Sequence, residues 1–229
     1  MEPLAQSDNG CAISATERPP SGKIEVEFKL LGTPEILDAI AASSLVGRYA
    51  TLPCGVEELT NLYFDTPDFQ LRRMGLTFRL RWNGADWLQT LKVGSEAVDG
   101  LFKRREWEQR IATSTPQIGV LPEGPELTPV RDIFSKFEIA FTTRFRRRTF
   151  QISFTGPLEQ ATTSLTLSLD SGTIVAGEKH MALAEVELEL DSGPESGLTS
   201  FANMLRAEFA LTPGSLSKAG RGYRLLGFL

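Results

Sequence analysis

Charged and apolar side chains alternate strictly in several short runs of the chain. The clearest runs are EVEFKL at 25–30, TFRLRW at 77–82 and EVELEL at 185–190. Because successive side chains of a β-strand point to opposite faces, each run predicts a strand with a charged face and an apolar face. The charged faces are also sorted by sign, with two arginines in the second run and three carboxylates in the third. Carboxylates spaced about 7 Å apart along a strand repel one another unless cations lie nearby.

The sorting by sign predicts that acidic and basic strands face each other across a shared polar interior. A strand that shows its charges to water, the usual arrangement in antiparallel sheets, is the alternative for any single run. Basic residues gather in 72–110 and 143–148, whereas 178–195 holds six acidic residues and one lysine. Such opposed walls suit a polyanion that carries a divalent cation, because Arg and Lys neutralise phosphate oxygens while carboxylates bind Mg²⁺ or Mn²⁺. The apolar faces would then point outward and need helices to cover them.

The remaining residue types exclude several kinds of site. His180 is the only histidine, so a zinc site with several imidazole ligands is excluded and any metal must be held mainly by oxygen. Cys11 and Cys54 match no zinc or redox spacing, and a disulfide framework is not expected. The sequence has no GxSxG turn for a serine triad and no GxxxxGK[ST] phosphate loop. A phosphate ligand would therefore be bound by side chains rather than by a P-loop.

Length and net charge narrow the class of protein. The 229 residues are 41% hydrophobic, which supports a packed core and excludes disorder of the whole chain. A formal net charge of −5 argues against a dedicated binder of nucleic acid or of anionic membranes. The sequence has neither an apolar run of about 18 residues nor a signal-peptide pattern, so we expect a cytoplasmic protein. It indicates no oligomeric state.

The elements that would position these charges follow from the same sequence. Residues 1–22 show no period and are predicted to be a disordered leader, and 23–229 is predicted to form one domain. Three runs have apolar residues at helical spacing after a proline or a Thr-Pro pair. Helices are therefore predicted over 33–47, from 128 onward and from about 194 onward. We expect their apolar stripes to pack on the outer faces of the strands.

Segments in order along the chain match the motifs of a known family. EVEFK at 25–29 resembles the ExExK signature of the CYTH superfamily, the triphosphate tunnel metalloenzymes. Seven further segments accompany it: NLYFDTP at 61–67, FRLR at 78–81, QTLK at 89–92, RRE at 104–106, LDSG at 169–172, EVELEL at 185–190 and SKAGRGY at 217–223. The series runs from residue 23 to the end of the chain. The resemblance is strongest to the bacterial inorganic triphosphatase branch.

The resemblance implies an α+β fold in which an eight-stranded antiparallel β-barrel forms a tunnel with a charged interior and helices packed outside. It implies a metal-dependent inorganic triphosphatase that uses Mg²⁺ or Mn²⁺ and hydrolyses tripolyphosphate, a small polyanion. By matching position, the expected metal ligands are Glu25, Glu27, Asp170, Glu185, Glu187 and Glu189. The expected phosphate-binding residues are Lys29, Arg79, Arg81, Lys92, Arg104, Arg147 and Lys218. The expected catalytic residues are Glu25, Glu27 and Lys29, and the match leaves open which carboxylate positions the attacking water.

Two features depart from the family pattern. Relatives often carry an acidic residue where this chain has Arg144. Strand alternation turns Arg147 toward the tunnel. It places Arg144, Arg146 and Arg148 on the opposite face, either as a solvated strip or as a surface for an acidic partner. Many relatives also continue into a helical, histidine-rich CHAD domain, whereas this sequence ends at Leu229, which indicates either a stand-alone enzyme or a chain cut at the domain edge.

Other functions remain as alternatives. Adenylate cyclase activity, or hydrolysis of thiamine or nucleoside triphosphates, would need a pocket for the organic group. Trp82, Trp87 and Trp107 could line such a pocket, although aromatic residues in strands more often pack in the core. A non-catalytic polyphosphate-binding module is the third possibility, but it would not need so many carboxylates in a site for a polyanion. His180 is predicted to lie at the surface, in a turn before the 185–190 strand.

Overall fold

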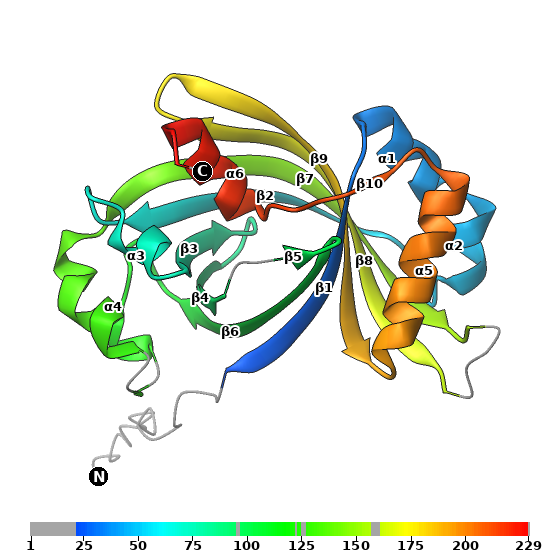
Figure 1. The fold of residues 1–229 in the computed structure, drawn as a ribbon, viewed down its shortest axis with the longest axis horizontal. Coiled ribbons are helices and arrows are strands. Elements are labelled where there is room, and N and C mark those ends of the chain that lie inside the picture. The colour runs from blue at the N-terminus through cyan, green and yellow to red at the C-terminus, as the bar shows by residue number, and fades with distance from the viewer. Residues whose placement is uncertain (1–21, 95–96, 122, 125–126, 157–160, 229) are drawn as a thin grey trace, which may run out of the picture.

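Antiparallel strands close into a β-barrel (Figure 1). The computed structural model describes residues 22–94, 97–121, 123–124, 127–156 and 161–228, so the predicted leader lies outside it except for residue 22. Within these ranges eight strands form the barrel in the order β1-β9-β8-β7-β2-β3-β4-β6, and β6 pairs with β1. Their bounds are β1 Lys23–Leu31, β2 Gly55–Asp65, β3 Leu76–Trp82, β4 Trp87–Val93, β6 Leu101–Ile111, β7 Glu138–Phe154, β8 Thr163–Ala176 and β9 Lys179–Ser192. The short strands β5 (Ala97–Val98) and β10 (Thr212–Pro213) pair with β6 and β1.

Strand β1 closes the barrel because two neighbours share it. Its first part pairs with β6, where Glu25 lies opposite Arg104. Its second part pairs with β9, where Lys29 lies opposite Glu187. The register therefore sets opposite charges side by side on one face of the sheet, at the short Cβ separation of cross-strand pairs. A slip of one residue would turn the whole charged face of β1 outward, so the charge pattern and the register depend on each other.

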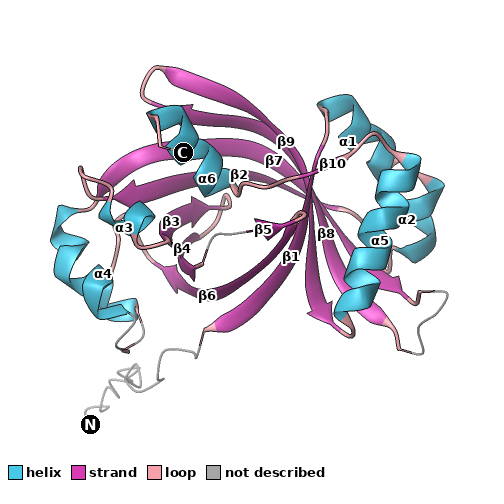
Figure 2. Cartoon of the chain, viewed as in Figure 1, coloured by secondary structure: helices cyan, strands magenta, loops and turns pink. Residues whose placement is uncertain are grey.

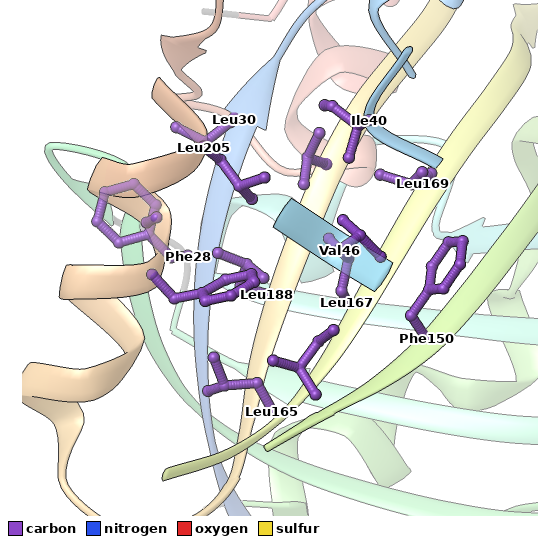
Figure 3. Packing of buried hydrophobic residues seen from close by; sticks show 14 of the residues in the cluster. Phe28, Leu30, Ile40, Val46, Phe150, Leu165, Leu167, Leu169, Leu188 and Leu205 are labelled. Carbon is purple, nitrogen blue, oxygen red and sulfur yellow. The ribbon is translucent and has the colours of Figure 1, made fainter. Parts of the chain in front are cut away.

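Helices cover the outer face of β1, β8 and β9 at one end of the molecule (Figure 2). They are α1 (Pro34–Ala41), α2 (Ser44–Tyr49) and α5 (Glu195–Glu208). Figure 3 shows the apolar cluster between these helices and the strands, in which Phe28, Leu188 and Leu205 are buried. This packing confirms that the apolar faces of the alternating strands point outward and are covered by helices. The helix predicted from about 194 is α5.

The helix predicted over 33–47 is two helices, so that prediction was wrong in one respect. Helix α1 ends at Ala41, and Ser43 begins a new helix because its Oγ accepts a hydrogen bond from the backbone N–H of Val46 at 3.1 Å. Serine favours such N-cap positions over the interior of a helix, since its hydroxyl competes for backbone donors. The apolar spacing continues across the break and therefore could not reveal it.

A second apolar cluster covers the outer face of β3, β4 and β6. It packs the short helices α3 (Gln70–Arg73) and α4 (Thr128–Ile133) against these strands, with Leu71 and Val130 fully buried. Helix α4 is the helix predicted from 128. Trp107 belongs to this cluster and Trp87 packs against it. Throughout the described part of the chain, the helices are too short or too polar to cross a bilayer.

The last helix, α6 (Lys218–Leu226), packs on inward-facing residues instead. The apolar cluster beneath it contains Leu59, Tyr63, Phe141, Phe145, Ile174, Ala176, Leu183, Ala219 and Tyr223. Strand alternation puts Phe141 and Phe145 on the same face of β7 as Arg147. The interior is therefore charged as expected in one part and apolar under α6. Gly222 allows close docking, because a Cβ at that position would lie 2.2 Å from the Phe141 ring.

Candidate active site

The inward-facing charges of the barrel line a cavity of about 350 Å³. Its walls come from seven of the barrel strands and from the start of α6. The sequence-predicted residues that line it are Glu25, Glu27, Arg79, Arg81, Lys92, Arg104, Arg147, Glu187, Glu189 and Lys218. Positions far apart in the sequence, which the family resemblance and the strand alternation had selected, thus meet around one space.

Three predicted residues lie behind the cavity wall. Lys29, Asp170 and Glu185 are at most 1% exposed and do not reach the cavity surface. The stem of Lys29 is covered by Gly214, where a Cβ would lie 3.0 Å from Lys29 Cγ. These three residues could therefore reach a ligand in the cavity only through the residues in front of them.

The three residues behind the wall form an ion cluster with two cavity residues, Lys218 and Glu187. Lys29 Nζ lies 2.8 Å from Glu185 Oε1 and also contacts Glu187 Oε1. Lys218 Nζ lies 2.6 Å from Asp170 Oδ2 and 2.8 Å from Glu187 Oε1. The two ammonium groups thus share one set of carboxylates. Removal of either lysine would leave these carboxylates with one counter-charge fewer, which is destabilising for buried acidic groups.

These contacts set the ionisation of the cluster. Burial alone would lower the pKa of Lys29, but Glu185 and Glu187 raise it well above its usual value. Burial alone would raise the pKa of Glu187, but Lys218 and Lys29 hold it well below its usual range. Both groups are therefore charged at neutral pH, and each charge depends on the presence of the other.

Glu25 and Glu27 of β1 form another part of the wall. Lys92 Nζ donates a hydrogen bond to Glu25 Oε1 at 2.7 Å, and Arg104 Nη2 lies 2.9 Å from Glu25 Oε2. Glu27 differs, because its Oε1 has no hydrogen-bond partner in the described residues, although the Lys29 ammonium lies 3.4 Å away. A buried carboxylate oxygen without a donor is costly. This oxygen is a buried acceptor that the described residues leave without a hydrogen-bond donor.

Arg79 and Arg81 of β3 have partners of different kinds. Arg79 Nη2 lies 3.7 Å from Glu108 Oε2. Arg81 Nε donates to the neutral amide oxygen of Asn61 at 2.9 Å, and Arg81 forms no ion pair within the described ranges. Burial, with repulsion from Arg79 and Arg147, lowers the pKa of Arg81 to about 10. An anionic ligand would relieve this repulsion, so Arg81 is the kind of side chain that gains from binding one.

The cavity also contains residues outside the predicted metal-binding, phosphate-binding and catalytic sets, among them Trp107, which was named only for an alternative pocket. They are Gly22, Lys23, Tyr63, Thr77, Glu106, Trp107, Glu108, Ser217 and Ala219. Glu106 and Glu108 follow Arg104 at the two-residue period, so the strand pattern was sufficient to find them. Trp107 lies on the opposite face of β6, yet it reaches the cavity beside Gly22, and strand alternation does not predict this reach.

The arginine strip of β7 lies on the outside of the barrel, and Arg147 faces the cavity. Arg148 Nη1 lies 2.9 Å from Asp38 Oδ1, while Arg146 Nε lies 4.0 Å from Glu58 Oε1. Both neighbouring acids belong to the same outer surface. Two of the three outer arginines are thus paired within the chain, as expected for a solvated face.

The carboxylates fit a divalent cation that prefers oxygen. Oxygens of Asp170, Glu185 and Glu187 lie within 4.8 Å of one another, although they already contact ammonium or guanidinium groups. Glu27 offers the unsatisfied buried oxygen beside them. His180 is exposed at the start of β9 and does not line the cavity, so the donors are oxygens. This donor set matches Mg²⁺ or Mn²⁺ better than zinc, which prefers nitrogen and sulfur.

Comparison with known proteins gives one family match and a curated relative. A family model described as CYTH domain matches residues 23–223. The inorganic triphosphatase of Haemophilus influenzae is 30% identical over 206 residues, which cover 88% of this chain and 54% of that protein. The chain therefore spans about half the length of this curated relative.

Among the solved structures that resemble this chain, two illustrate the shared fold. HpAC1 from Hippeastrum, described as an adenylyl cyclase candidate with a dominant triphosphatase activity, has a TM-score of 0.61 at 18% identity and covers 90% of this chain and 97% of its own. A protein from Pyrococcus horikoshii OT3 has a TM-score of 0.52 at 15% identity, with 89% of this chain and 98% of that chain covered. At these identities the likeness shows the fold alone. Because the family model matches most of the sequence and the barrel has the fold of these structures, the chain belongs to the CYTH domain family.

Proposed function

We propose that this chain is a metal-dependent inorganic triphosphatase that hydrolyses tripolyphosphate to pyrophosphate and phosphate. The observation that carries the proposal is a cavity in which arginine and lysine side chains face carboxylates. A polyanion requires the basic wall, and the acidic wall would repel it unless a divalent metal were bound between them. The relative from Haemophilus influenzae bears the name inorganic triphosphatase, which supports the same activity.

Phosphate oxygens would be bound by the basic residues of the cavity. These are Arg79, Arg81, Lys92, Arg104, Arg147 and Lys218. Guanidinium groups bind phosphate by charge-assisted and often bidentate hydrogen bonds, which also orient the chain of phosphates. Lys29 does not line the cavity, so in this proposal it neutralises Glu185 and Glu187 and holds them in place instead of touching phosphate.

The metal would be held by carboxylates of β1, β8 and β9. Glu25, Glu27, Glu187 and Glu189 line the cavity, and Asp170 and Glu185 lie directly behind it. When bound, Mg²⁺ or Mn²⁺ neutralises phosphate charge and polarises the phosphoryl group that is transferred. The carboxylates of Glu25 and Glu27 are buried and have little freedom to move, so they would hold the reacting groups in position.

In hydrolysis, a water oxygen attacks the terminal phosphorus of tripolyphosphate. At the same time the bond between that phosphorus and the bridging oxygen breaks. Negative charge then spreads over the transferred phosphoryl group and the departing pyrophosphate. The guanidinium and ammonium groups of the cavity are already held by strand and helix backbones, so they can stabilise this charge with little rearrangement. The proposal thus assigns catalysis to positioning and electrostatics, and it needs no histidine.

The direct test is phosphate release from tripolyphosphate by the purified protein with Mg²⁺ or Mn²⁺. We expect release with at least one of the two metals and loss of release with a chelator. Glu27→Gln should abolish it, whereas Glu58→Gln on the outer face should not, since Glu58 is exposed and does not line the cavity. Absence of release with both metals would disprove the proposal.

A substrate panel distinguishes the alternatives. Strand alternation puts Trp82 and Trp87 on the outer face, so of the three tryptophans only Trp107 lines the cavity. This placement gives less support to a nucleobase pocket than to a site for inorganic triphosphate. Preference for ATP with a cyclic product would indicate a cyclase. Tight binding of tripolyphosphate without turnover would indicate a non-catalytic binding module.

A further inference from the structure

Two segments from opposite ends of the sequence meet at a buried hydrogen bond. Asp65 ends β2, in the NLYFDTP segment, and Tyr223 lies in α6, in the SKAGRGY segment. The Tyr223 hydroxyl donates to Asp65 Oδ2 at 2.7 Å, and both residues are buried. Neither residue belongs to the proposed catalytic or phosphate-binding set, and neither lines the cavity. The contact therefore calls for another role.

Asp65 is held rigidly before Tyr223 reaches it. Its Oδ1 accepts backbone N–H groups of Thr66 at 2.7 Å and Leu71 at 2.8 Å, and its Oδ2 accepts that of Arg72 at 3.0 Å. The carboxylate thus serves as the cap for the turn into α3. Because three backbone donors fix it, Asp65 offers the Tyr223 hydroxyl an acceptor that cannot rotate away.

Helix α6 is tied to both sides of the barrel. On the β9 side, Arg221 Nη1 lies 3.1 Å from Glu185 Oε2. On the β2 and α3 side, the tie is the hydrogen bond from Tyr223 to Asp65. Burial and the negative charge of Asp65 raise the pKa of Tyr223, so its hydroxyl keeps its proton and remains a donor. The two contacts come from residues two positions apart, on different sides of the helix, and together they restrain its rotation.

The same helix carries Lys218 at its first position. The Lys218 ammonium reaches the cavity, 2.6 Å from Asp170 Oδ2 and 2.8 Å from Glu187 Oε1. Since Lys218 and Tyr223 lie on one rigid helix of nine residues, a shift of the Tyr223 end moves the ammonium in the cavity. A displacement of about 1 Å is enough to reduce catalysis strongly.

We propose that Asp65 and Tyr223 are positioning residues that hold α6 so that Lys218 stays at its place in the cavity. This inference rests on the proposed function for its kinetic readout. The hydrogen bond acts on the reaction only through Lys218. The effects on kcat/KM of losing the hydrogen bond and of losing the Lys218 ammonium should therefore not be additive.

The test is a double-mutant cycle with Tyr223→Phe and Lys218→Ala. Tyr223→Phe removes only the hydroxyl and keeps the ring against Phe141 and Phe69. We expect kcat/KM for tripolyphosphate to fall roughly tenfold in the wild-type background, and we expect almost no further fall in the Lys218→Ala background. An equal fall in both backgrounds, or no fall in the first, would overturn the proposal.

Two controls separate positioning from general loss of structure and from failure of the proposed function. Tyr49→Phe removes a hydroxyl from a tyrosine packed against Phe154 and Phe201, away from the cavity, and should leave kcat/KM unchanged. Amide hydrogen exchange needs no turnover: Tyr223→Phe should accelerate exchange in α6 and leave α5 unchanged. Unchanged exchange in α6 would refute the positioning role even if the protein hydrolysed another substrate. The cycle can also be measured as tripolyphosphate affinity, so absence of turnover alone would reject only the proposed function.

Discussion

Arg147 holds the carboxylate of Asp170 in two parallel contacts, Nε to Oδ1 at 2.7 Å and Nη2 to Oδ2 at 2.6 Å. The two residues lie directly opposite each other on β7 and β8. Arg147 Nη2 also lies 2.6 Å from Glu187 Oε2, so this guanidinium joins the buried ion cluster to the cavity wall. An arginine in this position serves the fold and faces the ligand space at the same time.

Replacement of Arg147 should therefore lower the free energy of unfolding more than replacement of Arg81. Arg147→Gln should lower the free energy of unfolding by about 3 kcal/mol, because Asp170 and Glu187 each lose one of their counter-charges. Arg81→Gln should change it far less, since Arg81 has an amide partner and is repelled by neighbouring arginines. Both variants should raise KM for tripolyphosphate. Urea unfolding and steady-state kinetics measure the two effects, and equal destabilisation by both variants would contradict the assignment.

The lowered pKa values of three carboxyls predict how stability depends on pH. Burial opposes ionisation of Asp170, Glu187 and Glu108, but neighbouring Arg and Lys side chains hold their pKa values below the usual ones of 3.8 for Asp and 4.5 for Glu. A carboxyl whose pKa is lower in the folded state stabilises the fold above its unfolded pKa and loses that effect as pH falls through its folded pKa. For these groups, unfolding free energy of the metal-free protein should be flat from about pH 7 to about pH 5 and fall below about pH 4.5.

Replacement of one of these carboxyls tests whether the lowered pKa values cause the fall of unfolding free energy at acid pH. Glu108→Gln should make the decrease in unfolding free energy at acid pH shallower. Glu195→Gln, at an exposed pair with Lys103, should leave the slope unchanged. Urea unfolding at a series of pH values measures both slopes. A slope in Glu108→Gln as steep as in the wild type would contradict the lowered pKa of Glu108.

The unsatisfied oxygen of Glu27 predicts a metal effect that can be measured without substrate. Mg²⁺ or Mn²⁺ should raise Tm, because a ligand that binds only the folded state stabilises it by about 2.7 kcal/mol at 100 times its Kd. Glu27→Gln should lose most of this shift, whereas Glu58→Gln should keep it. Thermal unfolding with and without metal gives the answer. A full shift in Glu27→Gln would place the metal elsewhere.

Gly172 of the LDSG segment should be intolerant of a side chain for a packing reason. A Cβ at this position would lie 2.1 Å from the Arg144 carbonyl oxygen and 2.5 Å from Phe145 Cα. Gly172→Ala should destabilise the protein by about 1–3 kcal/mol or more, since backbone cannot move aside as a flexible side chain can. Gly47→Ala in α2, where a Cβ would meet nothing within 4 Å, should instead be neutral or stabilising. Unfolding by urea compares the two.

Local periodicity made much of the cavity predictable from the sequence. The two-residue alternation in β1, β3 and β9 determines which side chains share a face, because it depends only on neighbouring residues. Sorted charges then indicated that these faces were turned inward. The same pattern extends to Glu106 and Glu108, which lie at even steps from Arg104.

Which residues form ion pairs across the barrel could be learned only from the tertiary structure. Closure of the sheet through β1 sets residues more than 150 positions apart against each other, as Lys29 and Glu185 are, and no local pattern encodes that register. The sequence determined the charges and the faces that carry them. Only the fold decided that Lys29, Asp170 and Glu185 lie behind the cavity wall, and that α6 brings Lys218 to it, because burial and ion pairing depend on packing between distant segments.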